Sequence, residues 1–243
     1  MKADDNASEK KEEAGERRHV GTGEWVGRKA PARGGIRVRT ARVLGVALAV
    51  AVALAAFTLW WRRNPSACPY GLRFVVGLPH PFITRARLRD VLAPRPGERV
   101  LEVGPGAGYY ALPVARWLEP GGTLDVLDVQ RKMLDYVVRR AAEDGITNVV
   151  PTQADARALP YPDASFDGAY LTLVLGEVPD QERALHELRR VLKPGGRLVV
   201  GELLIDPHYV PFGLLRERAE AAGLTFERRV GGMPGYFARF RVP

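Results

Sequence analysis

From Arg99 onward, short apolar runs alternate with longer stretches in which apolar residues recur three and four positions apart. The short runs predict buried strands, and the longer stretches predict helices with one apolar face. The predicted strands lie at about residues 99–104, 123–129, 148–153, 167–173 and 197–204. Because strands that alternate with helices favour a parallel sheet with right-handed crossovers, the sequence predicts a doubly wound α/β fold.

Two of the predicted helices have clear apolar faces, and the second has Asp180 as its N-cap. Their apolar positions are Met133, Leu134, Val137, Val138 and Ala141 in one helix, and Leu185, Leu188, Val191 and Leu192 in the other. After Pro211 a third helix is expected to run to Gly223, and two strands at about residues 225–230 and 236–242 end the chain. The helices would cover the sheet.

A different pattern occupies residues 43–61, which contain neither a charge nor a proline. At about 1.5 Å per residue, a helix of this length would cross roughly 28 Å of hydrocarbon. Trp60 and Trp61, followed by Arg62 and Arg63, are typical of the membrane interface. A cleaved signal peptide is the alternative, but about 42 residues precede the run and no small-x-small cleavage site follows it. The sequence therefore predicts an uncleaved transmembrane helix.

The remaining boundaries follow from composition. Residues 1–42 carry charges of both signs and few large apolar side chains, which predicts a disordered tail. Residues 62–81 form an apolar, proline-rich juxtamembrane segment, and residues 82–243 are long enough to bury one sizeable core.

Charge and reactive side chains exclude several classes of function. The formal net charge of +8 divides about evenly between residues 1–42 and the remainder, so no concentrated basic stripe predicts nucleic-acid binding. Cys68 is the single cysteine, which excludes an intramolecular disulfide. The four histidines lack ligand spacing, so no metal site is predicted.

The first predicted strand ends in Glu102, and three glycines follow at every second position, namely Gly104, Gly106 and Gly108. Glycine tolerates positive φ and lets the backbone approach a ligand closely. A dinucleotide site prefers Gly-x-Gly-x-x-Gly, but Tyr109 stands where its third glycine would be. The spacing therefore weakens the prediction of a dinucleotide site.

Two acids follow later strands. Asp128 ends the second predicted strand about 20 residues past the glycines, where a carboxylate can accept both hydrogen bonds of a ribose diol. Asp155 and Ala156 follow the third strand. Both acids have a simpler interpretation as helix-capping residues in loops.

Three segments together resemble a known family: the motif Glu-x-Gly-x-Gly-x-Gly at 102–108, the segment 159–170, and Leu-Lys-Pro-Gly-Gly at 192–196. They are similar to the class I, Rossmann-like S-adenosylmethionine (SAM)-dependent methyltransferases of the small-molecule type, including the quinone-biosynthesis C-methyltransferases. The resemblance covers about 82–243 and implies a seven-stranded, mostly parallel sheet with an antiparallel last strand. It implies cofactor-binding roles for Glu102 near the methionine amino group, Gly104, Gly106 and Gly108 in the loop, Asp128 at the ribose, and Asp155 with Ala156 at the adenine.

Candidates for the acceptor side follow the fourth and fifth predicted strands, since ligands in open α/β sheets face the carboxyl ends of strands. Glu177 is the candidate catalytic base or substrate contact, with a helix-start acid as the alternative. His208 is the second catalytic candidate, with a capping histidine as the alternative. A base is needed only if the acceptor arrives protonated.

These observations predict a membrane-anchored SAM-dependent methyltransferase that acts on a small-molecule or lipid-like acceptor. The alternatives are a membrane-tethered SAM- or nucleotide-binding sensor without turnover, and an NAD(P)-dependent oxidoreductase. More basic residues precede the segment 43–61 than follow it, which favours an external C-terminal domain. SAM is made in the cytosol, so the expected location is a single-pass cell-membrane protein with a cytosolic catalytic domain.

Overall fold

The computed structural model of the 243-residue chain describes the backbone of residues 34–72 and 77–243. The side chains of residues 34–42, 58 and 61–63 lie outside that description. The chain divides into two units between Val50 and Ala51, and the sheet lies wholly in the second. Residues 1–42 were predicted to be a disordered tail. Residues 1–33 of this tail lie outside the described part of the chain.

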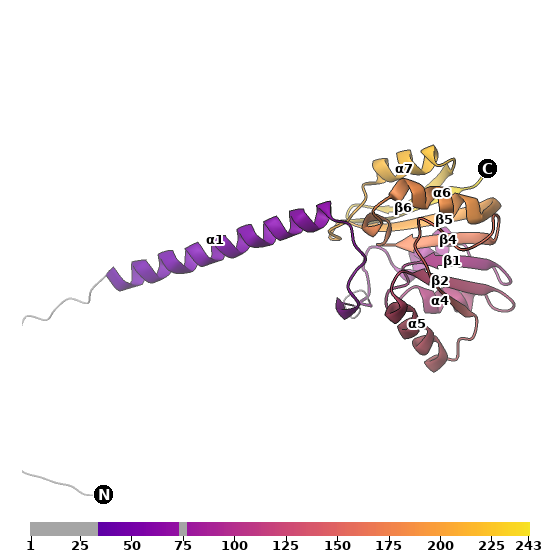
Figure 1. Ribbon diagram of the computed structural model, residues 1–243, viewed down its shortest axis with the longest axis horizontal. Coiled ribbons are helices and arrows are strands. Elements are labelled where there is room, and N and C mark those ends of the chain that lie inside the picture. Colours follow the sequence, from indigo (N-terminus) through magenta and orange to yellow (C-terminus); the bar gives the residue numbers. More distant parts are fainter. Residues whose placement is uncertain (1–33, 73–76) are drawn as a thin grey trace, which may run out of the picture. The chain divides into compact units, whose positions relative to one another are not determined.

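The sheet has seven strands in the order β3-β2-β1-β4-β5-β7-β6 (Figure 1). Their bounds are β1 Arg99–Val103, β2 Thr123–Asp128, β3 Val149–Gln153, β4 Phe166–Thr172, β5 Leu192–Leu203, β6 Thr225–Gly232 and β7 Gly235–Arg241. The first five strands pair in parallel, and β7 is antiparallel to β5 and β6. The predicted α/β class, the seven strands and the antiparallel last strand are confirmed.

Helices cover both faces of this sheet. They are α3 Arg85–Leu92, α4 Ala111–Trp117, α5 Arg131–Glu143, α6 Gln181–Val191 and α7 Phe212–Ala221. One apolar core joins α3, α4 and α5 to one face through residues such as Val100, and the other joins α6 and α7 to the opposite face through residues such as Leu101. Neighbouring residues of β1 thus point into different cores, as alternation along a strand requires.

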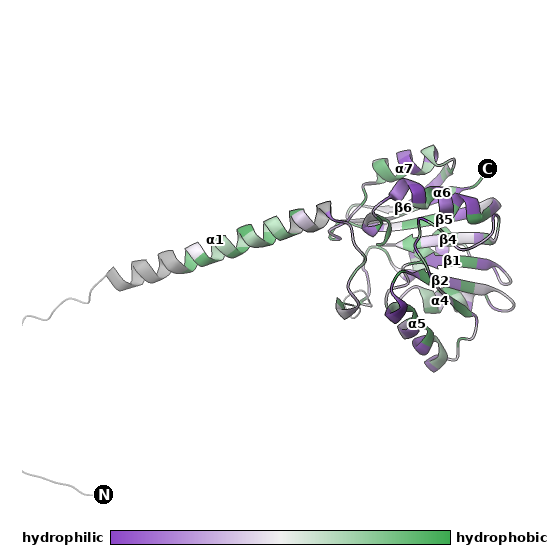
Figure 2. Cartoon of the chain, in the orientation of Figure 1, coloured by the Kyte–Doolittle hydropathy of each residue, from purple (hydrophilic) through white to green (hydrophobic). Residues whose placement is uncertain are grey.

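Helix α1 is continuous from Gly34 to Arg63 and so begins inside the predicted tail. The described middle of α1 is strongly hydrophobic (Figure 2). Within the part of the chain that the structure describes, no helix has both the length and the apolar character needed to cross a membrane. The prediction of a transmembrane helix at 43–61 is therefore not supported by the structure.

The strand order determines where a ligand can bind. Strand β1 pairs with β2 on one side and β4 on the other. Strands β2 and β3 therefore extend the sheet in one direction from β1, and β4 and β5 extend it in the opposite direction. In doubly wound sheets, the loops at such a switch point separate and leave a crevice at the carboxyl ends of the strands. The fold therefore places a binding site beyond the ends of β1, β2, β4 and β5.

Candidate functional site

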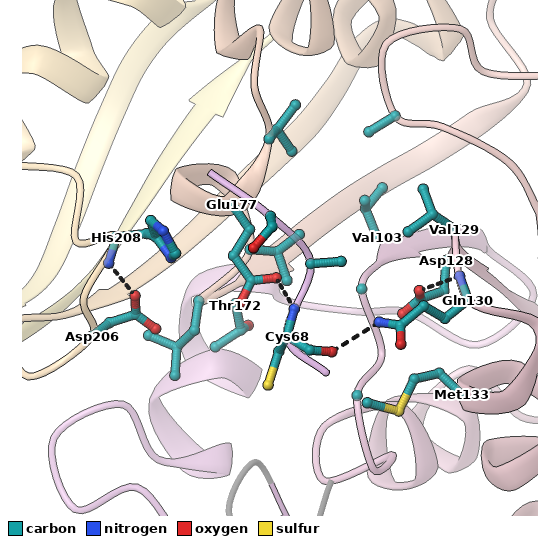
Figure 3. A pocket seen from close by; sticks show the side chains of 18 of the residues that line it. Cys68, Val103, Asp128, Val129, Gln130, Met133, Thr172, Glu177, Asp206 and His208 are labelled. Atoms are coloured by element: carbon teal, nitrogen blue, oxygen red, sulfur yellow. Dashed lines mark hydrogen bonds between the residues drawn. The ribbon is translucent and has the colours of Figure 1, made fainter. Parts of the chain in front are cut away.

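A cavity of about 480 Å³ lies at this place. Its volume is within the range of about 300–1,000 Å³ that is typical of small-molecule sites. The walls come from the loops after β1, β2, β3, β4 and β5, and from Ser66, Ala67, Cys68, Leu72 and His80, which precede the first strand (Figure 3). Of the predicted site residues, Gly104, Gly106, Asp128, Asp155, Ala156, Glu177 and His208 line the cavity.

The glycine loop after β1 has the backbone conformation that its spacing predicts. Gly104, Gly106 and Gly108 have φ values of 71°, 52° and 79°. A Cβ atom on Gly104 would lie 2.4 Å from Val174 Cγ2, so a side chain there would collide with the loop after β4. Gly108 is outside the cavity lining, and a Cβ atom on it would make ordinary contacts with Leu112 at 3.5 Å and Val137 at 3.6 Å. Gly104 therefore lets two loops meet at the cavity, whereas Gly108 supports the start of α4.

Glu102 is 2% exposed and lies in β1, behind the cavity wall. Burial raises its pKa to about 8, and the neighbouring Tyr170 opposes that rise. Its Oε2 atom and the Tyr170 hydroxyl are buried without a hydrogen-bond partner in the described structure. Near neutral pH the carboxyl is therefore largely protonated, and its Oε2 atom is left unsatisfied.

Asp128 ends β2 and faces the cavity (Figure 3). Its Oδ1 atom accepts a hydrogen bond from the Gln130 backbone N–H at 2.8 Å. Burial raises the pKa of Asp128, while the N–H groups of Gln130 and Val129 stabilise the carboxylate. The backbone thus holds this acid at the cavity wall.

Asp155 already has a strong partner. Its carboxylate accepts from the Arg157 backbone N–H at 2.8 Å and from the Arg157 guanidinium at 2.6 Å. The guanidinium lowers the pKa of Asp155. Because both side chains are about 40% exposed, the ion pair contributes at most about 1 kcal/mol and is easily rearranged. Ala156, beside it, is buried.

Glu177 lies in the short helix η2 (Leu175–Glu177) after β4 and lines the cavity. Its Oε2 atom accepts a hydrogen bond from the Cys68 backbone N–H at 3.1 Å. Burial raises the pKa of Glu177 to about 8; the carboxylates of Asp206 and Asp128 add to the rise, and the Cys68 N–H opposes it. Glu177 is thus a half-ionised acid near pH 8 in a mostly apolar cavity.

His208 lies beside Glu177 because the two loops approach closely. A Cβ atom on Gly176 would lie 1.8 Å from the His208 carbonyl oxygen, so only glycine fits between η2 and the loop after β5. The His208 backbone N–H donates to Asp206 Oδ1 at 2.7 Å (Figure 3). Both candidate catalytic residues therefore belong to one wall of the cavity.

Several lining residues were missed by the sequence prediction. Thr172 Oγ1 and His80 Nδ1 both belong to cavity-lining residues and are buried without a hydrogen-bond partner. Thr172 ends β4, so the rule about carboxyl ends of strands could have found it. His80 and Cys68 lie in a segment without periodicity, where the sequence contains no such signal. No group of His, Cys, Asp or Glu residues in the described ranges could hold a metal ion.

The seven-stranded sheet, the glycine turn after β1 and the acid at the end of β2 define a class I, Rossmann-like SAM-dependent methyltransferase. Residues 75–207, more than half of the chain, match the sequence model of the ubiE/COQ5 methyltransferase family. The chain belongs to this family. The predictions of the enzyme class and of SAM as its cofactor are confirmed.

Curated relatives include the ubiquinone/menaquinone biosynthesis C-methyltransferases UbiE of Vibrio campbellii and Pasteurella multocida. The first is 38% identical over 122 residues, which are 49% of this chain and 47% of the relative. The second is 36% identical over 122 residues, which are 49% of this chain and 46% of the relative. The chain thus spans about half the length of the curated relatives it matches.

Solved structures share the fold at low sequence identity. A SAM-dependent methyltransferase from Aquifex aeolicus has a TM-score of 0.62 and 22% identity, over 73% of this chain and 95% of its own. The [4+2]-cyclase SpnF has a TM-score of 0.60 and 22% identity, over 65% of this chain and 79% of its own. These likenesses concern the fold alone.

Proposed function

We propose that this protein transfers the methyl group of SAM to a small, mainly apolar acceptor with an acidic hydroxyl, such as a hydroquinone or a related phenol. The observation that carries the proposal is a single cavity that brings the glycine loop and Asp128 together with the buried acid Glu177. The names of the UbiE relatives, which refer to carbon methylation in quinone biosynthesis, support this acceptor class.

The residues of the cavity fit SAM. Gly104 and Gly106 allow the backbone to approach a ligand, Asp128 would accept from the ribose hydroxyls, and Asp155 with Ala156 would face the adenine. When bound, SAM supplies an electrophilic methyl group on a sulfonium. The protein's main contribution is alignment of the acceptor with that group, and such positioning can lower a barrier by about 7–11 kcal/mol.

Glu177 is the proposed general base. A phenol is a poor carbon nucleophile until its hydroxyl loses a proton, and the Glu177 carboxylate would accept that proton. With a pKa of about 8, the group is matched to proton transfer near neutral pH. His208, on the same wall, is the proposed second contact to the acceptor.

Product analysis tests this function. Full-length protein is incubated with methyl-deuterated SAM and a hydroquinone series, and products are identified by mass spectrometry. We expect a labelled product, and we expect Glu177→Gln to lower turnover by about 10²–10⁴-fold with SAM affinity nearly unchanged. Glu182→Gln, which removes an acid that is 72% exposed at the start of α6, is the matched control. SAM binding without any labelled product would favour the sensor, and hydride transfer from NAD(P)H would favour the oxidoreductase.

The glycine loop is tested separately by calorimetry. Gly106→Val should abolish SAM binding, because valine is strained at a φ of 52° and its branches would fill the cavity wall. Gly232→Val, at a position with open space around it, is the control. Unchanged SAM affinity in folded Gly106→Val protein would contradict this cofactor site.

We also propose that α1 contacts a lipid membrane. Ten large apolar side chains between Val43 and Trp60 are 52% to 67% exposed, and they leave this part of the helix without a polar face. Carbonate extraction should leave the protein with membranes, and the double variant Val46→Lys, Val50→Lys should release it. Met233→Lys, at an exposed apolar position in the second unit, should not. Recovery of the unmodified chain in the soluble fraction would contradict this proposal.

A further inference from the structure

Residues 66–68 pass along the cavity and connect two of its walls (Figure 3). The Cys68 backbone uses both of its polar groups for this connection. Its N–H donates to Glu177 Oε2 at 3.1 Å, and its carbonyl oxygen accepts from Gln130 Nε2 at 2.9 Å. We call Cys68, Glu177 and Gln130, which these two hydrogen bonds join, the Cys68 bridge.

Gln130 occupies an unusual position for such a contact. It is the N-cap residue of α5, where a short polar side chain normally bonds to the first turn of the helix. Here the side chain makes no capping bond and reaches Cys68 instead. Its backbone N–H donates to Asp128 Oδ1 at 2.8 Å, so the same residue contacts the acid proposed for the cofactor ribose. Gln130 therefore links the cofactor wall to the segment that holds Glu177.

We propose that Gln130 is a positioning residue for Glu177, because it holds the Cys68 carbonyl and thereby keeps the Cys68 N–H on the Glu177 carboxyl. The proposal rests on the proposed function in one respect only, namely that Glu177 meets the acceptor. With one oxygen held by the Cys68 N–H, the carboxyl has a defined orientation toward the cavity. Without the Gln130 amide, the segment 66–68 loses this hydrogen bond to the cofactor wall, and Glu177 loses the restraint that depends on it.

Loss of the Cys68 hydrogen bond should change the pKa of Glu177 in one direction, upward. Burial and the carboxylates of Asp206 and Asp128 raise the pKa of Glu177, and the Cys68 N–H is the group that lowers it. Glu202, in β5, is buried, and the carboxylates of Asp206 and Glu177 act on it. His208, in the next loop, lines the cavity. Loss of the Cys68 hydrogen bond leaves the opposing influences in place, so the pKa of Glu177 rises further and less carboxylate is present at neutral pH.

The single cysteine makes the bridge directly observable. The full-length protein, labelled with [¹⁵N]cysteine, has one labelled backbone amide, that of Cys68. We expect its NMR signal to shift with pH around a midpoint near 8 as Glu177 ionises. The shift should disappear in Glu177→Gln. This measurement reports the bridge whether or not the protein has methyltransferase activity.

The variants Gln130→Leu and Gln130→Glu remove the donor to the Cys68 carbonyl, and the second keeps the shape of the side chain. In both variants, the midpoint of the Cys68 amide titration should move up by at least half a pH unit, or the Cys68 amide proton should exchange with water too fast for its signal to be detected. Turnover at pH 7 should fall at least threefold, with recovery at higher pH, while SAM affinity stays within about threefold. The control is Gln153→Leu, which removes a similar side-chain bond, to the Val129 carbonyl at 3.0 Å; Gln153 itself does not line the cavity.

Two results would overturn the proposal. A Cys68 titration in both Gln130 variants that matches the unmodified protein would show that Gln130 does not position Glu177. A tenfold loss of SAM affinity with an unchanged titration would make Gln130 a cofactor contact only. A protein with the expected titration but no methylated product would refute the proposed function and leave the bridge intact.

Discussion

Gly176→Ala is the substitution for which the structure supplies the clearest magnitude. The added Cβ atom would lie 1.8 Å from the His208 carbonyl oxygen, whereas real Cβ atoms essentially never approach closer than 3.0 Å. Because the opposing atom belongs to the backbone, η2 and the loop after β5 must separate by about 1.2 Å, the difference between these two distances. Overpacking of this kind costs about 1–3 kcal/mol of the free energy of unfolding.

The same displacement moves Glu177 relative to the cavity. A misplacement of about 1 Å near reacting groups can cost about 100-fold in rate. We therefore expect the melting temperature to fall by roughly 2–12 °C and turnover to fall by about 100-fold. Gly176 lies outside the cavity lining, so SAM affinity should change little.

Differential scanning calorimetry, SAM titration and the labelled-methyl assay measure these three quantities. Gly213→Ala is the matched control, because nothing lies within 4 Å of the added atom and the position is helical. It should be neutral or stabilising by up to about 1 kcal/mol. A Gly176→Ala protein with unchanged melting temperature and turnover would show that the close contact between η2 and His208 does not organise the site.

Three further predictions concern charge and protonation. Asp128→Ala should weaken SAM binding by about 1.5–3 kcal/mol in calorimetry, through loss of a charged acceptor; equal affinity would remove Asp128 from the ribose site. Burial raises the pKa of the Cys68 thiol from 9.0 to about 11, so at pH 8 it should react with a disulfide reagent about 100-fold more slowly than in denatured protein, and equal rates would contradict this burial. Glu102, Glu177 and Glu202 have pKa values raised by burial from 4.5 to about 8, so the folded state holds more protons than the unfolded state between these values. The urea midpoint should therefore fall as pH rises from 5 to 8, and Glu102→Gln should flatten the dependence; a midpoint that rises with pH would refute it.

The fold was predictable because its elements have local signatures. In α5, four of the five predicted apolar positions are fully buried, and Asp180 caps α6 by accepting from the Arg183 N–H, as its place before the apolar pattern predicts. The three glycines of the loop likewise adopt the positive φ angles that glycine tolerates. In each case a short stretch of sequence contains the whole physical reason for the structure.

The Cys68 bridge could not be predicted in this way. Its two hydrogen bonds join residues 62 and 109 positions apart, and residues 64–72 contain neither a helical nor a strand period. Sequence reasoning proposed Glu177 as a candidate from its place after a strand, but the segment that contacts it depends on how the whole second unit packs. The membrane span at 43–61 was inferred from its apolar run and the Trp and Arg residues that follow it, and the structure does not support it.

The charge of the cavity connects the cofactor to the base. Asp128, Asp155, Glu177 and Asp206 line the cavity, and Asp155 is already paired with Arg157. Burial raises the pKa of Glu177, and the carboxylates of Asp206 and Asp128 add to that rise. A bound sulfonium would place a positive charge in this cavity, and an opposite charge nearby favours the ionised form of an acid.

By linkage, SAM binding should lower the pKa of Glu177 and release a proton near pH 7, and ionised Glu177 should strengthen SAM binding by the same free energy. Under the proposed function, the base would then be ionised mainly when the methyl donor is already in place.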